Sequence, residues 1–315
     1  MYMYMYMYMY ILVKTYIYIY IVEMMLSQVN PHPRDRLIVF DEEPHIYTIT
    51  TDPDSNYTSC TTFIHSFFSH FDADKIIDRM TRSKGWVDSK YYGLTAEQIK
   101  ERWDQNRDQA SAAGTAMHKA IEDFYNGKST LEELKESPDL QYFLNFYKDI
   151  GHTLKPYRSE WMIFDDQLKL AGSIDFVTEN EDGTLNLWDW KRSREIRRDT
   201  KWQRGLTPVN HLPDTNYYHY SLQLNLYKAI LENNYNKTVN QLALVVMHPD
   251  QDDYEVIVVP NLAKEICAIL NHRIETNNLD CQPFETNETV ETEAKSDDTD
   301  LDTEHISQAP LECFI

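Results

Sequence analysis

Apolar and polar residues alternate with a period of two through the middle of the chain, the pattern of strands buried on one face. Three such segments follow one another closely, with turn residues between them. Two shorter segments flank a turn at Glu43-Pro44, and two more come later in the chain. Strands are therefore expected within 36–50 and at 157–164, 168–178, 185–191, 241–248 and 254–259.

Helical periodicity occupies the segments around these strands. The clearest case is 110–126, where apolar residues recur at spacings of three and four and Gly127 follows as a natural helix end. Helices alternating with a central run of strands predict an α/β fold with an α+β-like mixed sheet and an N-terminal helical region. Further helices are expected after 57, between 72 and 110 with breaks at Gly85 and Gly93, and at about 130–150, 219–233 and 261–275.

The composition agrees with a folded core and limits the function. Of 315 residues, 42% are hydrophobic and 26% charged, which is typical of globular proteins. The 51 acidic and 30 basic residues give a net charge of −21, which excludes a nucleic-acid binder that is basic throughout but permits a local basic patch. The cysteines form no C-x-x-C pair, so neither a disulfide framework nor a zinc finger is expected.

The two ends of the chain differ from the single domain expected at 31–285. Residues 1–24 are a low-complexity run of Met, Tyr and Ile that resembles a translated DNA repeat. We expect this run not to be structural and translation to begin at Met24 or Met25, which N-terminal sequencing tests. A membrane anchor is the alternative, but regular tyrosines suit a hydrocarbon core poorly, so no stable membrane insertion is expected. Residues 286–315 hold nine acidic residues and one lysine, which predicts a disordered acidic tail and a candidate binding segment for a protein partner.

Two aspartates are predicted to face each other on the second and third strands of the central run. The loop Glu181-Asp182-Gly183 fits a three-residue hairpin with glycine at the left-handed position. Asp175 and Asp189 each lie seven residues from its centre, so they would be directly opposite, with Cβ atoms about 4.5–5.5 Å apart. A two-residue turn would instead place Asp189 on the other face of the sheet.

Such a pair of carboxylates predicts a cation between them, because like charges repel unless one is present. Oxygen ligands of this kind suit Mg²⁺ or Mn²⁺. Lys191 lies on the same face as Asp189 and could hold a metal-bound water or stabilise charge on a phosphate. The alternative is a structural ion pair in which Lys191 neutralises the two aspartates.

Five motifs in order resemble the PD-(D/E)XK nuclease superfamily, in its RecB-like exonuclease branch. GSID at 172–175 and DWK at 189–191 resemble the signature itself. GTAMH at 114–118 resembles the helix that carries a histidine ligand, Glu160 lies on the preceding strand, and QLNLY at 223–227 matches the Q-x-x-x-Y motif. Versions from large DNA viruses and related mobile elements look most similar.

The resemblance implies a restriction-endonuclease-like core and assigns the site residues. His118, Asp175, Asp189 and the carbonyl of Trp190 become metal ligands, Lys191 the catalytic lysine, and Glu160 a further catalytic or ligand carboxylate. Gln223 and Tyr227 would face the site from one helix and contact substrate. The cofactor implied is Mg²⁺ or Mn²⁺. Although some relatives carry a four-cysteine iron–sulfur cluster, no such cluster is expected here, because Cys60, Cys267, Cys281 and Cys313 are widely spaced.

Each of the outlying site residues also has a plain structural interpretation. His118 could be an ordinary residue on the flank of its helix, and Glu160 a solvated strand residue. Gln223 and Tyr227 could simply pack beside the apolar stripe of Leu222, Leu226 and Ile230.

The segment 191–204 is the one strongly basic stretch of this acidic chain, with seven basic and two acidic residues. Cationic groups that follow a backbone, with an aromatic ring for stacking, are what a single strand or a frayed end requires. A solvated charged loop is the alternative. The candidate substrate contacts here are Arg192, Arg194, Arg197, Arg198, Lys201 and Trp202.

Taken together, the site residues predict a metal-dependent phosphodiesterase, and the resemblance implies that it is a RecB-like exonuclease that hydrolyses DNA in replication, recombination or repair. Its partner would be DNA, as single strands or duplex ends, and its location intracellular, in a host nucleus or cytoplasm if viral. A catalytically silent binding module of the same fold and an RNA endonuclease are the alternatives. Intact His118, Asp175, Asp189 and Lys191 argue against the silent module.

Overall fold

The computed structural model describes residues 25–279 and 281–284. The low-complexity segment, the acidic tail and Cys313 lie outside the described residues. Within the part that is described, no helix is both long and apolar enough to cross a membrane.

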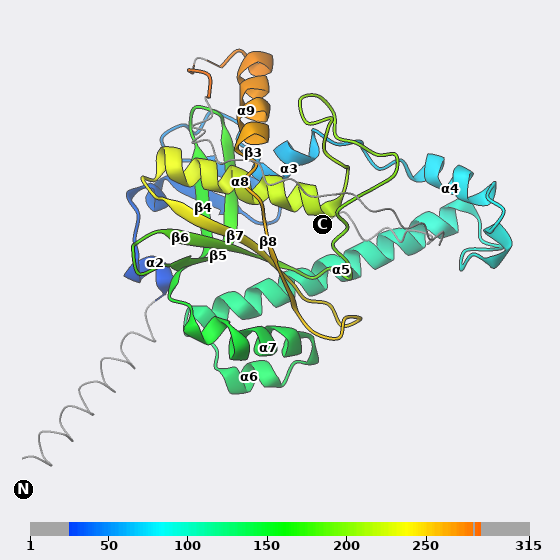
Figure 1. The fold of residues 1–315 in the computed structure, drawn as a ribbon, viewed down its shortest axis with the longest axis horizontal. Coiled ribbons are helices and arrows are strands. Elements are labelled where there is room, and N and C mark those ends of the chain that lie inside the picture. The colour runs from blue at the N-terminus through cyan, green and yellow to red at the C-terminus, as the bar shows by residue number, and fades with distance from the viewer. Residues whose placement is uncertain (1–24, 280, 285–315) are drawn as a thin grey trace, which may run out of the picture.

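The main sheet is mixed and six-stranded, which confirms the predicted fold class (Figure 1). Strand order is β3-β5-β6-β7-β8, with β4 also paired to β5. The β3–β5 and β6–β7 pairs are parallel, and the other pairs are antiparallel. The strands are β3 (Thr58–Ser59), β4 (Pro156–Asp165), β5 (Leu170–Glu179), β6 (Leu185–Lys191), β7 (Val239–Val246) and β8 (Glu255–Val258). A separate hairpin joins β1 (Ile38–Asp41) to β2 (Ile46–Ile49), as the sequence predicts.

One edge of β5 is only partly covered by other strands. β4 pairs with β5 from Leu170 to Thr178, so it takes one edge along nearly the whole strand. β3 and β6 must then share the other edge, where β3 pairs with Leu170 and Ala171 and β6 begins to pair only at Phe176. The span 172–175, which holds the GSID motif, is left between them without a strand partner on that edge.

Helices cover both faces of the sheet, because its strands alternate apolar residues between two cores. On β7, Leu242 and Leu244 join the core under α3 (Cys60–His65), α8 (Asn216–Asn234) and α9 (Ala263–Asn277). Ala243 and Val245 join the opposite core under α6 (Leu131–Lys135), α7 (Gln141–Asp149) and the C-terminal half of α5 (Ala96–Tyr125). This alternation is the period of two that the sequence shows.

The helix predicted at about 130–150 is broken in the structure. Helix α6 ends at Lys135, a 3₁₀ turn covers Pro138–Leu140, and α7 follows. Pro138 has no backbone N–H and disfavours helical geometry in the residue before it, so it stands at the first position of a new turn. The helix through 110–126 ends as predicted, with Gly127 at a positive φ of 70°.

The N-terminal half of α5 extends away from the sheet together with α4 (Ala73–Thr81) (Figure 1). Ile77, Ile99 and Trp103 form a small apolar cluster there, separate from the two cores beside the sheet. We call residues 72–110 the arm.

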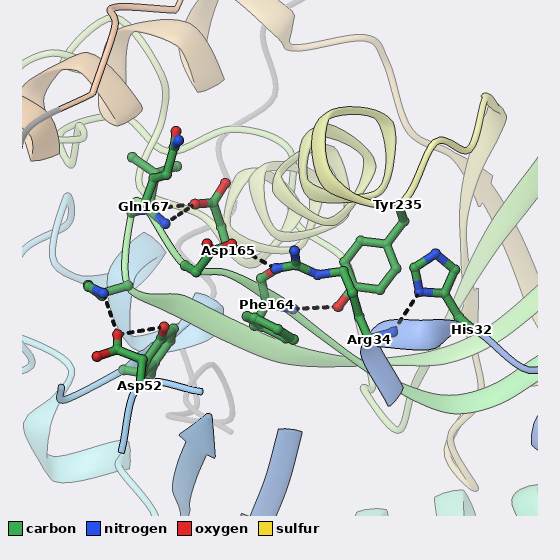
Figure 2. A network of polar contacts seen from close by, with 11 residues as sticks. His32, Arg34, Asp52, Phe164, Asp165, Gln167 and Tyr235 are labelled. Atoms are coloured by element: carbon green, nitrogen blue, oxygen red, sulfur yellow. Dashed lines mark hydrogen bonds and ion pairs between the residues drawn. The ribbon is translucent and has the colours of Figure 1, made fainter. Parts of the chain in front are cut away.

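The segment that follows α2 (Leu26–Val29) fastens the β4–β5 turn (Figure 2). The Arg34 guanidinium donates to the Phe164 carbonyl at 3.1 Å and to Asp166 at 2.9 Å, and it lies 3.9 Å from the centre of the Phe164 ring. The Phe164 N–H in turn donates to the Tyr235 hydroxyl at 3.0 Å. The hairpin that carries Glu160 and Asp175 is thereby held from its turn end.

Candidate active site

The hairpin loop sets the register that the sequence predicts. Gly183 has φ of 82°, the loop closes between Asn180 and Thr184, and Phe176 pairs with Trp188. One residue further on the strands part. There the Asp175 carboxylate accepts a hydrogen bond from the Trp190 N–H at 2.8 Å, across the gap where a strand pair would otherwise continue. The register is therefore the predicted one, and Asp175 and Asp189 lie one residue beyond the last strand pair, where the sheet opens.

Helix α5 brings His118 into this opening. Its Nε2 atom lies 2.9 Å from the Trp190 carbonyl oxygen, and its Nδ1 atom lies 3.6 Å from Asp175 Oδ2. A neutral imidazole that donates from Nε2 to the carbonyl leaves the Nδ1 lone pair facing the carboxylate. The Trp190 carbonyl, predicted as a metal ligand, contacts His118 here, and its ligand role stays a prediction.

Glu160 reaches the same opening from β4. Its Oε1 atom lies 3.7 Å from His118 Nδ1, and its Oε2 atom accepts a hydrogen bond from the Ser173 hydroxyl at 2.9 Å. The backbone of Glu160 has φ of 44°, a left-handed conformation that is costly for a residue with a Cβ atom and is often found at functional sites. Glu160 is therefore held in place and is not simply a solvated strand residue.

Asp189 and Lys191 form a buried ion pair beside this cluster. Lys191 Nζ lies 2.8 Å from Asp189 Oδ2, and the side chains are only 15% and 3% exposed. The ammonium also lies 4.5 Å from the centre of the Tyr220 ring on α8. The ion pair of the structural interpretation is thus present, but it is buried next to a histidine and two further carboxylates.

The buried charges of the cluster raise the pKa of three of its members. Burial lowers the pKa of His118, but the charges of Asp175 and Glu160 outweigh it and raise the pKa to about 9. Burial raises the pKa of Asp189 to about 6, against the opposing effect of Lys191. Burial also lowers the pKa of Lys191, yet Asp189 and Asp175 bring it above its usual value. These shifts describe a site that concentrates negative charge and retains protons to balance it.

The donor set fits a hard divalent cation. One ligand atom each of His118, Glu160 and Asp175 lies within 4.8 Å of the other two. One imidazole nitrogen and two carboxylate oxygens suit Mg²⁺ or Mn²⁺, whereas thiolates, which would favour softer metals, are absent from this cluster. Asp189 is turned toward Lys191 and is not one of these three, and its predicted role as a metal ligand stays a prediction.

Helix α8 lines the neighbouring side of the opening. The Gln223 amide donates to the Tyr227 hydroxyl at 3.1 Å, and both residues are buried. A Cβ atom on Gly172 would lie 2.7 Å from Tyr227 Cε1, so the glycine of GSID lets this ring pack against β5. The contacts show a packing role for Gln223 and Tyr227, and their contact with substrate stays a prediction.

The basic segment leaves the site directly from Lys191 and runs without helix or strand to residue 203. Arg194 pairs with Asp250, and the Arg198 guanidinium lies 4.9 Å from the centre of the Tyr217 ring. Trp202 is 88% exposed. Arg192 and Arg197 are half-buried and Lys201 is exposed, and for all six residues the substrate contact stays a prediction.

Two residues of this site do not appear among the sequence-based candidates. Ser173 holds Glu160, and its place two residues before Asp175 on an alternating strand was the available signal. Tyr220 contacts Lys191, and its spacing of three and seven from Gln223 and Tyr227 places all three near one face of α8.

Comparison with known proteins assigns the chain to a family. The chain belongs to the PD-(D/E)XK nuclease superfamily, whose family model matches residues 140–309, more than half of its length. The match includes Glu160, Asp175, Asp189, Lys191, Gln223 and Tyr227, whereas His118 precedes it.

Two solved structures are similar at low identity. SSO0001 is 15% identical, with 69% of this chain and 84% of that chain covered and a TM-score of 0.27. The "putative exonuclease" of Eubacterium rectale is 12% identical, with 70% and 79% covered and a TM-score of 0.34. No curated protein matches the chain.

Proposed function

We propose that the protein is a Mg²⁺- or Mn²⁺-dependent deoxyribonuclease, a RecB-like exonuclease that serves replication, recombination or repair. The observation that supports it most is the convergence of His118, Glu160 and Asp175 beside the buried Asp189–Lys191 pair. Membership of a nuclease superfamily supports phosphodiester hydrolysis as the reaction.

Different side chains of the site would have different roles in hydrolysis. His118, Glu160 and Asp175 would hold the cation, which supplies charge neutralisation at the phosphate and a more acidic water. Lys191 is held by Asp189 on one side and by the Tyr220 ring on another, so its ammonium is fixed at the edge of the opening. From there it can orient the attacking water and stabilise the charge that develops on the phosphate oxygens. Asp189 keeps Lys191 protonated and oriented.

A cleavage assay tests this proposal. End-labelled single-stranded DNA, duplex DNA and RNA are incubated with Mg²⁺, Mn²⁺ or EDTA and with wild type, Lys191→Ala or Lys148→Ala. Lys148 is exposed on α7 and serves as the matched control. We expect metal-dependent DNA cleavage by wild type and by Lys148→Ala, and its loss in Lys191→Ala. The lengths of the end-labelled products give the direction in which the strand is digested.

The other outcomes lead to the alternatives. Cleavage of RNA alone would mark a ribonuclease. Binding of DNA without cleavage under every condition would leave the silent binding module.

A further inference from the structure

A cavity of about 250 Å³ lies beside the candidate active site, on the side of α3 and the start of α8. Its lining is almost entirely aromatic or imidazole: His65, Phe68, Ser69, His70, Phe71 and His219. Phe68 and His219 are buried and stack on each other with ring centres 3.9 Å apart, and the His65 ring lies 5.2 Å from His219. Ser69, His70 and Phe71 are exposed, so they lie at the mouth.

The walls of this cavity are fixed. His219 contacts Asp214 at 2.9 Å, and the two side chains are only 5% and 10% exposed. The Phe71 ring meets Trp103 edge-on at 5.8 Å, and the backbone beside Phe68 is held by a hydrogen bond from the Leu206 N–H to the Phe67 carbonyl at 2.7 Å. A space with such walls presents flat rings to an incoming group without having to rearrange first.

The cavity also lies near Lys191, the proposed phosphate contact. His219 is followed by Tyr220, whose ring lies 4.5 Å from Lys191 Nζ. Burial, together with the positive charges around it that include Lys191, lowers the pKa of His65 to about 4, so this ring is neutral at pH 7. An aromatic space that includes the neutral His65 ring therefore lies next to the Lys191 ammonium.

We propose that this cavity receives one unpaired nucleobase of the strand whose phosphate lies at Lys191. The inference rests on the proposed nuclease function and names its substrate class, a single strand or a frayed end. A base has two flat faces for ring stacking and polar edges that Ser69 and His70 can meet. A base within a duplex must first leave its stack, so the cavity favours unpaired substrate.

Abasic scanning tests the proposal. A short single strand carries one abasic residue at each position in turn, and its affinity is measured by fluorescence anisotropy with Mn²⁺ in the Lys191→Ala background, which keeps the strand intact. The same scan is run with Ser69→Phe, which fills the mouth of the cavity, and with Ser83→Phe, an equal change at an exposed serine of the arm. Running the scan with DNA and with RNA strands shows which kind of nucleic acid supplies the base.

We expect one position where loss of the base weakens binding roughly fivefold or more, because one stacked base contributes at least about that much. That sensitivity should persist in Ser83→Phe and vanish in Ser69→Phe and in Phe71→Ala. A scan without a sensitive position, a position equally sensitive in Ser69→Phe, or failure to bind any strand would overturn the proposal. Loss of cleavage in Lys191→Ala is measured separately, so the nuclease can stand where the base site fails.

Discussion

Binding of a divalent cation should depend strongly on pH, because the cation must displace a proton from His118. In the metal-free site the carboxylates of Asp175 and Glu160 raise the pKa of His118 to about 9. At pH 7 the imidazole is therefore protonated, and only about one molecule in a hundred has the lone pair that a metal ligand needs. Below this pKa, each unit rise in pH makes that form about tenfold more abundant.

The expected result is a tenfold gain in apparent Mn²⁺ affinity, about 1.4 kcal/mol, between pH 7 and pH 8. Isothermal titration calorimetry measures it directly. Repeating the titration in two buffers of different ionisation enthalpy counts the protons released, and about one proton per Mn²⁺ is expected at pH 7. The sign follows from the raised pKa, since the proton-bound state dominates below pH 9 and competes with the cation.

Two variants identify the group that releases the proton. His118→Gln should bind Mn²⁺ more weakly and with little dependence on pH. His152→Gln, a change at an exposed histidine, should behave like wild type. An affinity for Mn²⁺ that does not change from pH 7 to 8 in wild type would refute the reasoning, as would an unchanged proton release in His118→Gln.

Three further predictions follow from packing around the site. Gly172→Ala should lower the free energy of unfolding by about 1–3 kcal/mol in urea denaturation, because its Cβ atom would lie 2.7 Å from Tyr227 Cε1. Gly114→Ala, with open space around it in α5, should be neutral or stabilising by up to about 1 kcal/mol, and an equal loss of stability in both variants would contradict this. Arg34→Ala should lower the free energy of unfolding by about 1–3 kcal/mol in the same assay, because it removes the hydrogen bonds to Phe164 and Asp166. Exposed Arg36→Ala should cost almost nothing; an Arg34→Ala variant as stable as wild type would show that Arg34 does not fasten the β4–β5 turn. Ser173→Ala should weaken Mn²⁺ binding about tenfold or more with little change in thermal stability, since it frees Glu160; unchanged affinity would remove Glu160 from the ligand set.

The centre of the fold could be predicted because its signals are local. The hairpin of β5 and β6 depends on a three-residue loop with Gly183 at positive φ, and a fixed loop fixes the register on both sides of it. Alternate apolar residues of β6 and β7 likewise belong to the two cores on opposite faces of the sheet. This alternation is expected of any sheet that helices cover on both faces. Such features need no knowledge of distant residues.

The remaining features depend on contacts far apart in the chain. β5 and β6 part beyond the Phe176–Trp188 pair, and there Asp189 lies with Lys191 while Glu160 lies with His118 and Asp175. No spacing in the sequence encodes this arrangement. The left-handed backbone of Glu160 is stabilised by its surroundings and opposes its own preference. The cavity beside α8 likewise joins residues of α3 and the loop after it to His219, more than a hundred residues later.

Helix α5 is a single rod with the arm at one end and a site residue toward the other. It runs unbroken for 30 residues, with Trp103 in the apolar cluster of the arm and His118 beside Asp175. The two residues are about 22 Å apart along the axis at 1.5 Å per residue. A tilt of about five degrees around His118 would therefore carry Trp103 through roughly 2 Å. Because both residues belong to one unbroken helix, a displacement of residues 72–110 that tilted α5 as a rigid body would also change the angle at which His118 meets the carboxylates.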